Sequence, residues 1–425
     1  MLDIKYIISN ENEVKKHLKN RRFDMHFLDA FLTLAKKRGH IMYEAQSAKS
    51  KLAAISKEFG LYKNNPEKLA QIKKEIQKIK QHQSLLDEQS NELIAKITNM
   101  LLQIPNLPTN DVPIGRDEND NVVIEKFENL GRGLVSDVLP HYEIAKNLDI
   151  IDIERAVKLS GSRYVIYKNQ GAKLVRALIN FMLDLHLSKG YTEFNTPVIV
   201  KETALYGTGQ LPKFQEDLYK IEGVNEYLIP TAEVTLTNIY NNEIINLDKP
   251  FKATAYTECF RSEAGSSGKD TKGIIRQHQF KKIELVKVVN AESAWNEYNQ
   301  TVLDAADVLE KLEIPYQKVR LCTGDLGFSA KTTIDLELWL PSEQRFREVS
   351  SISYFGDFQA RRAMIRYKDN DGKTNYAHTI NGSGVAVDRL IAAILEQYQN
   401  PDGSVSVPKV LIPYMSGVEK IEKQS

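Results

Sequence analysis

The sequence predicts an α+β protein in which an all-α helical hairpin precedes a domain built on an antiparallel sheet. Three observations carry this prediction. Apolar residues recur every three and four positions through residues 31–100, and three prolines interrupt residues 104–115. Beyond them, helix-like and strand-like segments follow one another without a repeated βα period. The length of 425 residues agrees with two or three domains.

The predicted hairpin is an antiparallel coiled coil. Two series of seam positions each continue for about four heptads, which is typical of supercoiled helices. Gly60 suits the end of the first helix and Pro66 the start of the second, so we expect a tight turn between them. The first series is Phe31, Leu34, Arg38, Ile41, Ala45, Ala48, Leu52, Ile55 and Phe59, and the second is Leu69, Ile72, Ile76, Ile79, Gln83, Leu86, Ser90, Leu93, Ile97 and Met100.

Positive charge gathers in this hairpin. Residues 36–80 hold 12 basic and 4 acidic side chains, although the whole chain has a net charge of only +1. A basic helical element suits contact with a phosphate backbone, and so predicts a folded RNA as the partner. A dimerisation coiled coil, or a helix pair lying on the body, would explain the seams but not the charge. The lysines near the expected turn are Lys49, Lys51, Lys57, Lys63, Lys68, Lys73, Lys74, Lys78 and Lys80.

The segment that follows, residues 104–115, has no periodic pattern and is interpreted as a linker. A helix-like segment at 170–190 and several strand-like segments come after it, which favours a sheet of antiparallel strands. The strand-like segments are residues 193–200, 226–230, 251–260, 281–289, 333–340 and 353–367.

Composition narrows the class of protein. Cys259 and Cys322 belong to no CxxC pattern or Cys/His cluster, so neither a disulfide framework nor a structural zinc site is expected. No apolar run approaches the roughly 18 residues that a membrane span needs. We therefore expect a cytoplasmic protein with no membrane partner.

The sequence lacks the common phosphate-binding loops. Residues 371–374 contain Gly-Lys-Thr, but Tyr367 stands where a P-loop needs its first glycine. Gly382 and Gly384 lack the third glycine of a dinucleotide fingerprint. Nucleotide binding must therefore use another geometry.

A set of blocks points to such a geometry. They are TAE (231–233), FRSEAGSSGKDTKGIIRQHQFKKIE (260–284), EVSS (348–351), DFQARR (357–362) and NGSG (381–384). These blocks resemble the signature motifs of class II aminoacyl-tRNA synthetases, and the full set is similar to the seryl-tRNA synthetase family. The resemblance implies a tRNA-binding arm at residues 1–104, a linker at 105–130 and a catalytic domain at 131–425.

The resemblance implies a reaction in two steps. L-serine and ATP form seryl-adenylate, and the seryl group then passes to the 3′ end of serine tRNA, with selenocysteine tRNA as a further family substrate. A carboxylate must approach an anionic phosphate, so fixed positive groups are required. The matched catalytic residues are Arg261, Glu348 and Arg389. The matched ATP-binding residues are Arg261, Ser262, Glu263, Arg276, Phe280, Glu348, Val349, Ser350, Ser351 and Arg389. The matched serine-binding residues are Thr231, Ala232, Glu233, Glu284 and Ser383.

The matched residues have distinct implied roles. Arg261 corresponds to the arginine that holds the substrate carboxylate and α-phosphate, for which its planar fork is suited. Phe280 corresponds to a ring that stacks on adenine. Glu348 and Ser351 correspond to ligands of a catalytic Mg²⁺, a hard ion that prefers oxygen donors. The family also implies a homodimer formed through the helix at 170–189, and tRNA contacts by the arm lysines.

Two departures from the family pattern bear on this site. Asp388 stands where the family usually has glycine, and could pair with Arg389 or point away from it. Residues 352–355 read ISYF, where the family often has CSNC or a similar run. Other interpretations remain: a class II synthetase of the threonyl or prolyl type, an aminoacyl:carrier-protein ligase, or an RNA-binding paralogue without catalysis. About 30 residues follow Leu395, which is too few for the C-terminal anticodon-binding domain of the threonyl or prolyl type.

Overall fold

The structure, a computed structural model, describes residues 1–61, 65–264, 268, 270 and 272–423. The chain divides into two compact units, Met1–Pro105 and Asn106–Ser425. The predicted boundary at residue 104 and the predicted linker at 105–130 stay predictions. Residues 122–127 of that segment form a strand of the main sheet.

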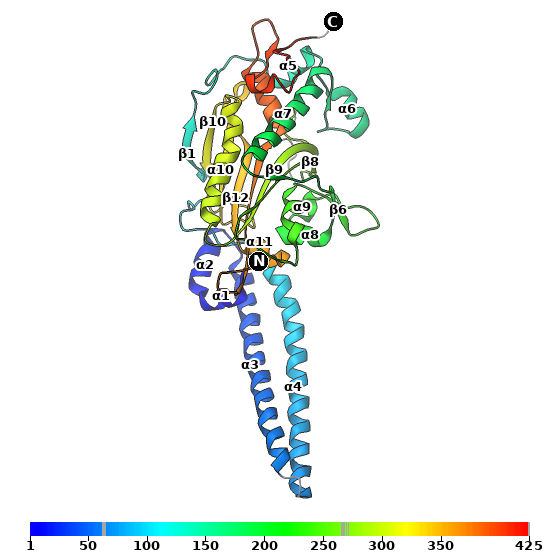
Figure 1. The fold of residues 1–425 in the computed structure, drawn as a ribbon, viewed down its shortest axis with the longest axis vertical. Coiled ribbons are helices and arrows are strands. Elements are labelled where there is room, and N and C mark those ends of the chain that lie inside the picture. Colours follow the sequence, from blue (N-terminus) through cyan, green and yellow to red (C-terminus); the bar gives the residue numbers. More distant parts are fainter. Residues whose placement is uncertain (62–64, 265–267, 269, 271, 424–425) are drawn as a thin grey trace. The chain divides into compact units, whose positions relative to one another are not determined.

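The first unit is all helical. It consists of α1 (Ile4–Ser9), α2 (Glu11–Asn20), α3 (Met25–Leu61) and α4 (Pro66–Leu101). α3 and α4 run side by side in opposite directions (Figure 1). Asn65 caps the start of α4, because its side chain accepts a hydrogen bond from the backbone N–H of Lys68, and Pro66 follows at the first helical position.

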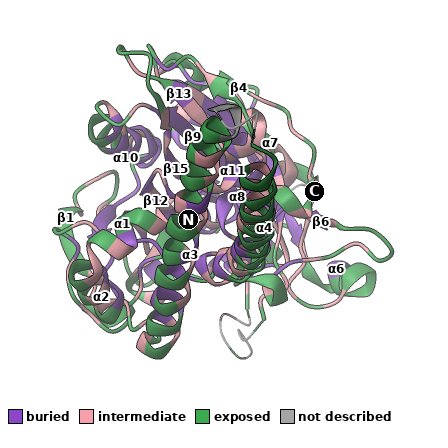
Figure 2. Cartoon of the chain, turned by 90° about the horizontal axis from the view of Figure 1, so that it is seen from below, coloured by how far each residue is buried: buried purple, intermediate pink, exposed green. Residues whose placement is uncertain are grey.

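The seams in this unit are as the sequence predicts. Every described seam position is buried or half-buried, whereas most other positions of α3 and α4 are exposed, as the green outer faces of the helices show (Figure 2). Among the described residues, no helix is both long enough and apolar enough to cross a membrane.

The second unit is built on an eight-stranded sheet. Neighbouring strands are antiparallel except β4 and β8, which are parallel. In spatial order the strands are β1 (Val122–Phe127), β10 (Tyr316–Arg320), β11 (Thr332–Leu340), β12 (Arg345–Gly356), β15 (His378–Ala386), β9 (Gln279–Val289), β8 (Phe251–Phe260) and β4 (Thr192–Glu193). The predicted fold class, α+β with an antiparallel sheet, is confirmed.

Alternation along β9 separates the core from the site. Ile283 points into the main hydrophobic core, which includes Leu178 of α7 (Asn169–Ser188), Leu309 of α10 (Ala294–Lys311) and Ile391 of α12 (Val387–Gln397). Lys282 and Glu284 on the other face line a pocket. Strand geometry thus places charged side chains opposite the apolar face that packs the helices.

The remaining elements are short. The helices are α5 (His141–Asn147), α6 (Ile153–Ser160), α8 (Glu202–Thr208), α9 (Glu233–Thr237) and α11 (Phe358–Ala363). The strands are β2 (Ile151–Asp152), β3 (Ile166–Tyr167), β5 (Ile199–Lys201), β6 (Glu226–Leu228), β7 (Ile244–Ile245), β13 (Arg366–Lys368), β14 (Thr374–Tyr376), β16 (Val405–Ser406) and β17 (Lys420–Ile421).

The prediction of one strand over residues 353–367 is wrong in its middle. β12 ends at Gly356, whose φ of +59° turns the backbone. Helix α11 follows and buries Phe358, Gln359, Ala360 and Ala363. The side chain of Arg361 donates to Asp357 at 2.7 Å across the first turn. Local apolar spacing did not reveal this helix, because only packing against the rest of the unit selects it.

Candidate active site

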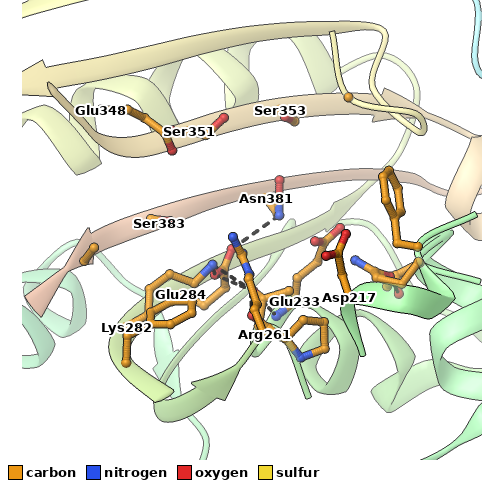
Figure 3. Close-up of a pocket in the computed structure, with 18 of the residues that line it drawn as sticks. Asp217, Glu233, Arg261, Lys282, Glu284, Glu348, Ser351, Ser353, Asn381 and Ser383 are labelled. Atoms are coloured by element: carbon orange, nitrogen blue, oxygen red, sulfur yellow. Dashed lines mark hydrogen bonds and ion pairs between the residues drawn. The ribbon is translucent and has the colours of Figure 1, made fainter. Parts of the chain in front are cut away.

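One pocket of about 750 Å³ collects most of the predicted site residues (Figure 3). Its walls come from α8, α9, β9, β12, β15, α12 and the segments between them. The predicted residues that line it are Thr231, Glu233, Arg261, Glu263, Arg276, Phe280, Glu284, Glu348, Val349, Ser351, Ser383 and Arg389.

Three predicted contact residues do not line the pocket. Ala232 is buried in a cluster with Leu236 of α9. Ser262 donates its hydroxyl to the Glu216 carbonyl at 2.6 Å. Ser350 is buried and donates to the Ser383 carbonyl at 2.6 Å. The side chains of these residues therefore support the pocket wall instead of facing its interior.

Arg261 follows the end of β8 and lies over an aromatic ring. Its guanidinium carbon is 5.1 Å from the centroid of Phe280, and its Nε donates to the Pro230 carbonyl at 3.4 Å. Such stacking restricts a side chain that is otherwise highly flexible. Arg261 is therefore held at the pocket wall by a stacking contact and a hydrogen bond.

A buried charged cluster occupies one side of the pocket. Lys282 Nζ lies 2.5 Å from Glu284 Oε2 and donates to Thr231 Oγ1 at 2.8 Å. Thr231 in turn donates to Glu284 Oε2 at 2.9 Å, and Asn381 donates to Glu284 Oε1 at 3.3 Å. Glu284 is fully buried, so these partners compensate for a charge that water cannot reach.

Glu233 is a second buried carboxyl near this cluster. Burial, and then the nearby Glu284 charge, raise the pKa of Glu233 from 4.5 to about 7. Gln359 of α11 donates to Glu233 Oε1 at 2.6 Å and also to the Thr208 carbonyl at 3.1 Å. Thr379 donates to the Gln359 side-chain oxygen at 2.7 Å, which orients the amide. Glu233 is therefore held in one orientation and titrates near neutral pH.

A β-bulge brings Glu348 and Ser351 to the same pocket. Ser350 pairs with Leu336 and Glu348 pairs with Glu337, so Val349 is an extra residue on β12. Strict alternation would send residues three apart to opposite faces, and the bulge reverses this. On the neighbouring strand, burial and the charge of Glu348 raise the pKa of Asp335 well above its usual range.

Arg389 lies in the first turn of α12, beside Glu348. Its Nη1 donates to the Glu348 carbonyl at 2.5 Å and lies 3.7 Å from the Glu348 carboxylate, while its Nε donates to the Ile275 carbonyl at 3.4 Å. Asp388 makes different contacts. It accepts from the Tyr167 hydroxyl at 2.5 Å and from the backbone N–H of Lys281 at 2.8 Å. Asp388, which stands where the family usually has glycine, therefore connects α12 to β3 and β9 by hydrogen bonds.

Arg276, one of the predicted ATP-binding residues, lies among acidic groups. Its Nη1 donates to Glu263 at 2.7 Å, and its Nε donates to Asp270 at 3.4 Å. Arg347 of β12 donates to the other Asp270 oxygen at 2.6 Å. From the sequence we also expect the loop at residues 265–273 to meet the tRNA acceptor end. Residues 265–267, 269 and 271 of this loop lie outside the described residues.

Sequence reasoning missed three residues that organise the pocket. Lys282 was detectable, because it stands two residues before Glu284 on a predicted strand and shares its face. Asn381 lies beside the predicted Ser383 and carried no separate signal. Gln359 was hidden, because its segment was predicted to be a strand.

The predicted tRNA-binding lysines on the arm are exposed. This holds for Lys49, Lys51, Lys57, Lys68, Lys73, Lys74, Lys78 and Lys80. Lys63 lies outside the described residues. The other lysines present positive charge to solvent along α3 and α4.

Each of the two structural units is matched by a known family model. The model of the seryl-tRNA synthetase N-terminal domain matches residues 1–108, and that of the class II tRNA synthetase core domain (G, H, P, S and T) matches residues 219–398. A serine–tRNA ligase of Mycoplasmopsis agalactiae is 56% identical over 99% of this chain and 100% of its own. One from Metamycoplasma arthritidis is 54% identical over the same shares. A crystal structure of seryl-tRNA synthetase from Pyrococcus horikoshii complexed with ATP is 35% identical, with a TM-score of 0.94 over 100% of both chains.

The antiparallel sheet, its pocket and the core-domain match define a class II aminoacyl-tRNA synthetase. Within that class, the chain belongs to the seryl-tRNA synthetase family. The family and the class of enzyme predicted from the sequence are thereby confirmed.

Proposed function

We propose that this protein activates L-serine with ATP to seryl-adenylate and transfers the seryl group to the 3′ end of serine tRNA. The observation that carries this proposal is the pocket in which a buried Thr231–Lys282–Glu284 cluster adjoins Arg261. One wall thus offers partners for a small polar amino acid, and the neighbouring residues offer positive charge for phosphate. The likeness to an ATP-complexed seryl-tRNA synthetase supports the same assignment.

In the first step, a carboxylate oxygen of serine attacks the α-phosphorus of ATP. The bond from that phosphorus to the bridging oxygen breaks, and pyrophosphate leaves. Arg261 opposes the negative charge that gathers around the α-phosphate, and its fork can hold phosphate and carboxylate together. Phe280 restricts Arg261 and offers a ring for the adenine base. In the second step, a terminal ribose hydroxyl attacks the acyl carbon, and AMP leaves.

Serine is selected by the buried polar cluster. Glu233 and Glu284 provide negative charge for the substrate ammonium, and Thr231 and Ser383 provide hydroxyl groups near its side chain. A site that hydrogen-bonds the substrate hydroxyl rejects alanine by about 10⁴-fold, because its own polar groups would be left unpaired. Threonine, with its extra methyl group, is expected to be excluded by the size of this part of the pocket.

Mg²⁺ is proposed as the cofactor. The residues fit this ion, because the bulge at Val349 turns the half-exposed Glu348 carboxylate and the Ser351 hydroxyl to one pocket. Oxygen donors of this kind suit a hard cation, which takes its other ligands from water and substrate phosphates. When bound, the ion would neutralise phosphate charge. Arg389, held by the Glu348 carbonyl, would add positive charge at the same edge.

The proposed assembly is a homodimer, and the proposed compartment is the cytoplasm. Helix α6 buries only Ala156 and exposes Ile153, Val157 and Leu159, the last at 77%. Exposed apolar side chains on one short helix suit a protein interface. A second copy of this chain is the proposed occupant, in addition to the interface that the family resemblance implies at the helix of residues 170–189 (α7). Cys259 and Cys322 are free thiols, in agreement with a reducing compartment. Sedimentation at micromolar concentration should give a dimer, and a monomer would contradict this part of the proposal.

The decisive experiment is ATP–pyrophosphate exchange by the purified protein across a panel of amino acids. Serine should support exchange in the presence of Mg²⁺, whereas alanine and threonine should not. Charging of serine tRNA would then test the second step. If no amino acid in the panel supported exchange, the enzymatic proposal would be overturned. If only threonine or proline supported exchange, the proposed specificity for serine would be overturned.

A further inference from the structure

A buried carboxylate lies at the far end of helix α12 from Arg389. Glu396 is fully buried and accepts four hydrogen bonds. The donors are the backbone N–H of His141 at 2.9 Å, Nδ1 of His141 at 2.7 Å, and the backbone N–H and hydroxyl of Ser342, both at 2.9 Å. With these donors Glu396 acts as an acceptor, so Nδ1 of His141 carries a proton.

The other ring nitrogen of His141 then acts as an acceptor. The backbone N–H of Ile274 donates to Nε2 at 3.2 Å. Gly273 allows this approach, because a Cβ built there would lie 2.1 Å from Nε2, and its φ is +78°. His141 is itself buried. The imidazole therefore joins Glu396 directly to the backbone where the 265–273 loop returns to the sheet.

The segment that His141 holds is part of the pocket. Ile274, Ile275 and Arg276 all line it. The Ile275 carbonyl accepts from Arg389 at the start of α12, and Glu396 near the end of α12 holds Ile274 through His141. Both ends of one helix are thus connected to two adjacent residues of this segment, Ile274 and Ile275.

We infer that His141 is a positioning residue for ATP binding, through its hold on residues 274–276. The inference rests on the proposed function, because it assigns this segment to the ATP side of the pocket. Thr231, Glu233 and Glu284 lie on other elements, so the serine side does not depend on the same hydrogen bond. Loss of the Nε2 acceptor should weaken ATP binding while leaving serine binding largely intact.

Two variants with amide side chains separate the two hydrogen bonds of the His141 imidazole. In His141→Asn the amide reaches the position of Nδ1 and can still donate to Glu396, but nothing accepts from Ile274. In His141→Gln the amide oxygen reaches the position of Nε2 and can accept from Ile274. Each variant removes one hydrogen bond of a buried side chain, so a purely structural role predicts similar effects on stability and on kinetics.

The test is pyrophosphate exchange with the full-length protein, in which the KM values for ATP and for serine are measured separately. We expect His141→Asn to raise the KM for ATP about tenfold with the KM for serine within about twofold, and His141→Gln to restore most of the loss. Equal KM values for ATP in the two variants, or a parallel rise in the KM for serine, would overturn the inference. Exchange by the wild-type protein tests the proposed function independently.

Discussion

The lysine residues of α3 and α4 on the arm are exposed to solvent, whereas Lys282 in the pocket of the second unit is buried and paired. On the arm, Lys73, Lys74 and Lys78 lie on exposed positions of α4, where water and salt screen a charge within about 8 Å at physiological ionic strength. In the pocket, Lys282 is buried and lies 2.5 Å from Glu284. Charges on the arm therefore act collectively and are individually replaceable. A buried charge depends on one partner, and the partner depends on it.

The largest effect is expected where one buried partner is removed. Lys282→Met leaves Glu284 buried without its cation, which should lower the free energy of unfolding by about 3–5 kcal/mol and abolish serine-dependent exchange. Urea denaturation measures the first effect. Lys420→Met is the matched control, because Lys420 pairs with Asp402 at an exposed site, and its unfolding midpoint should not change. Equal shifts in the two variants would remove the distinction between buried and exposed pairs.

The next largest effect is expected where the geometry of a charged group changes but its charge does not. Arg261→Lys keeps the positive charge but loses the planar fork and its stacking on Phe280, so kcat/KM for exchange should fall about 10²–10³-fold. Steady-state exchange assays give this ratio. Arg366→Lys serves as the control, since Arg366 of β13 donates to the Met364 carbonyl outside the pocket. Unchanged kcat/KM in Arg261→Lys would mean that charge alone is sufficient.

A smaller effect follows from the pKa of Glu233. That pKa is about 7 in the folded protein, against an ordinary 4.5, so the unfolded chain is the more readily ionised form between these values. The contribution of protonated Glu233 to stability is therefore present below pH 4.5 and is lost as the pH rises from 4.5 to about 7, by up to about 3 kcal/mol. Glu233→Gln removes this loss. The difference in unfolding free energy between variant and wild type should therefore move in favour of the variant from pH 5 to pH 8.

Ligand-free urea denaturation at the two pH values measures that change. Any effect that the amide of Glu233→Gln has on its contact with Gln359 is the same at both pH values, so it cancels when the two differences are compared. A difference that does not vary with pH would show that Glu233 ionises as readily in the pocket as in the unfolded chain.

The smallest effect belongs to the arm. Lys73→Ala combined with Lys74→Ala should raise the KM for tRNA a few-fold and reduce the salt dependence of binding by about one to two counterions, with exchange unchanged. Aminoacylation assays over a salt series provide both values. Lys96→Ala, farther from the turn on the same helix, should leave the salt dependence as it is. A loss of exchange in the double variant would show that the arm contributes to the active site.

The arm was the part of the fold most open to prediction. The helical seams follow a local period, so the residues that pack, such as Ile41 and Ile97, could be named from spacing alone. Strands β8, β9 and β11 were also predicted within two residues. β1 and α11 were missed, because an edge strand and a short helix depend on which surfaces cover them.

For the site, most of the residues matched by motif line the pocket, but several of their partners were not identified. Nothing local shows that Gln359 orients Glu233, or that Asp388 turns to Tyr167 instead of Arg389. These pairs join residues more than a hundred positions apart. Their hydrogen bonds exist only after the sheet has formed.

The sequence by itself determined the coiled-coil arm, its charge, the antiparallel class of the fold and the family, since these depend on periods, composition and ordered motifs. The tertiary structure alone decided which charges became buried and paired. The bulge at Val349 turned Glu348 and Ser351 to one face, and burial beside Glu284 raised the pKa of Glu233. The physical reason is that desolvation and strand register arise from long-range packing, whereas a helical seam needs only its neighbours along the chain.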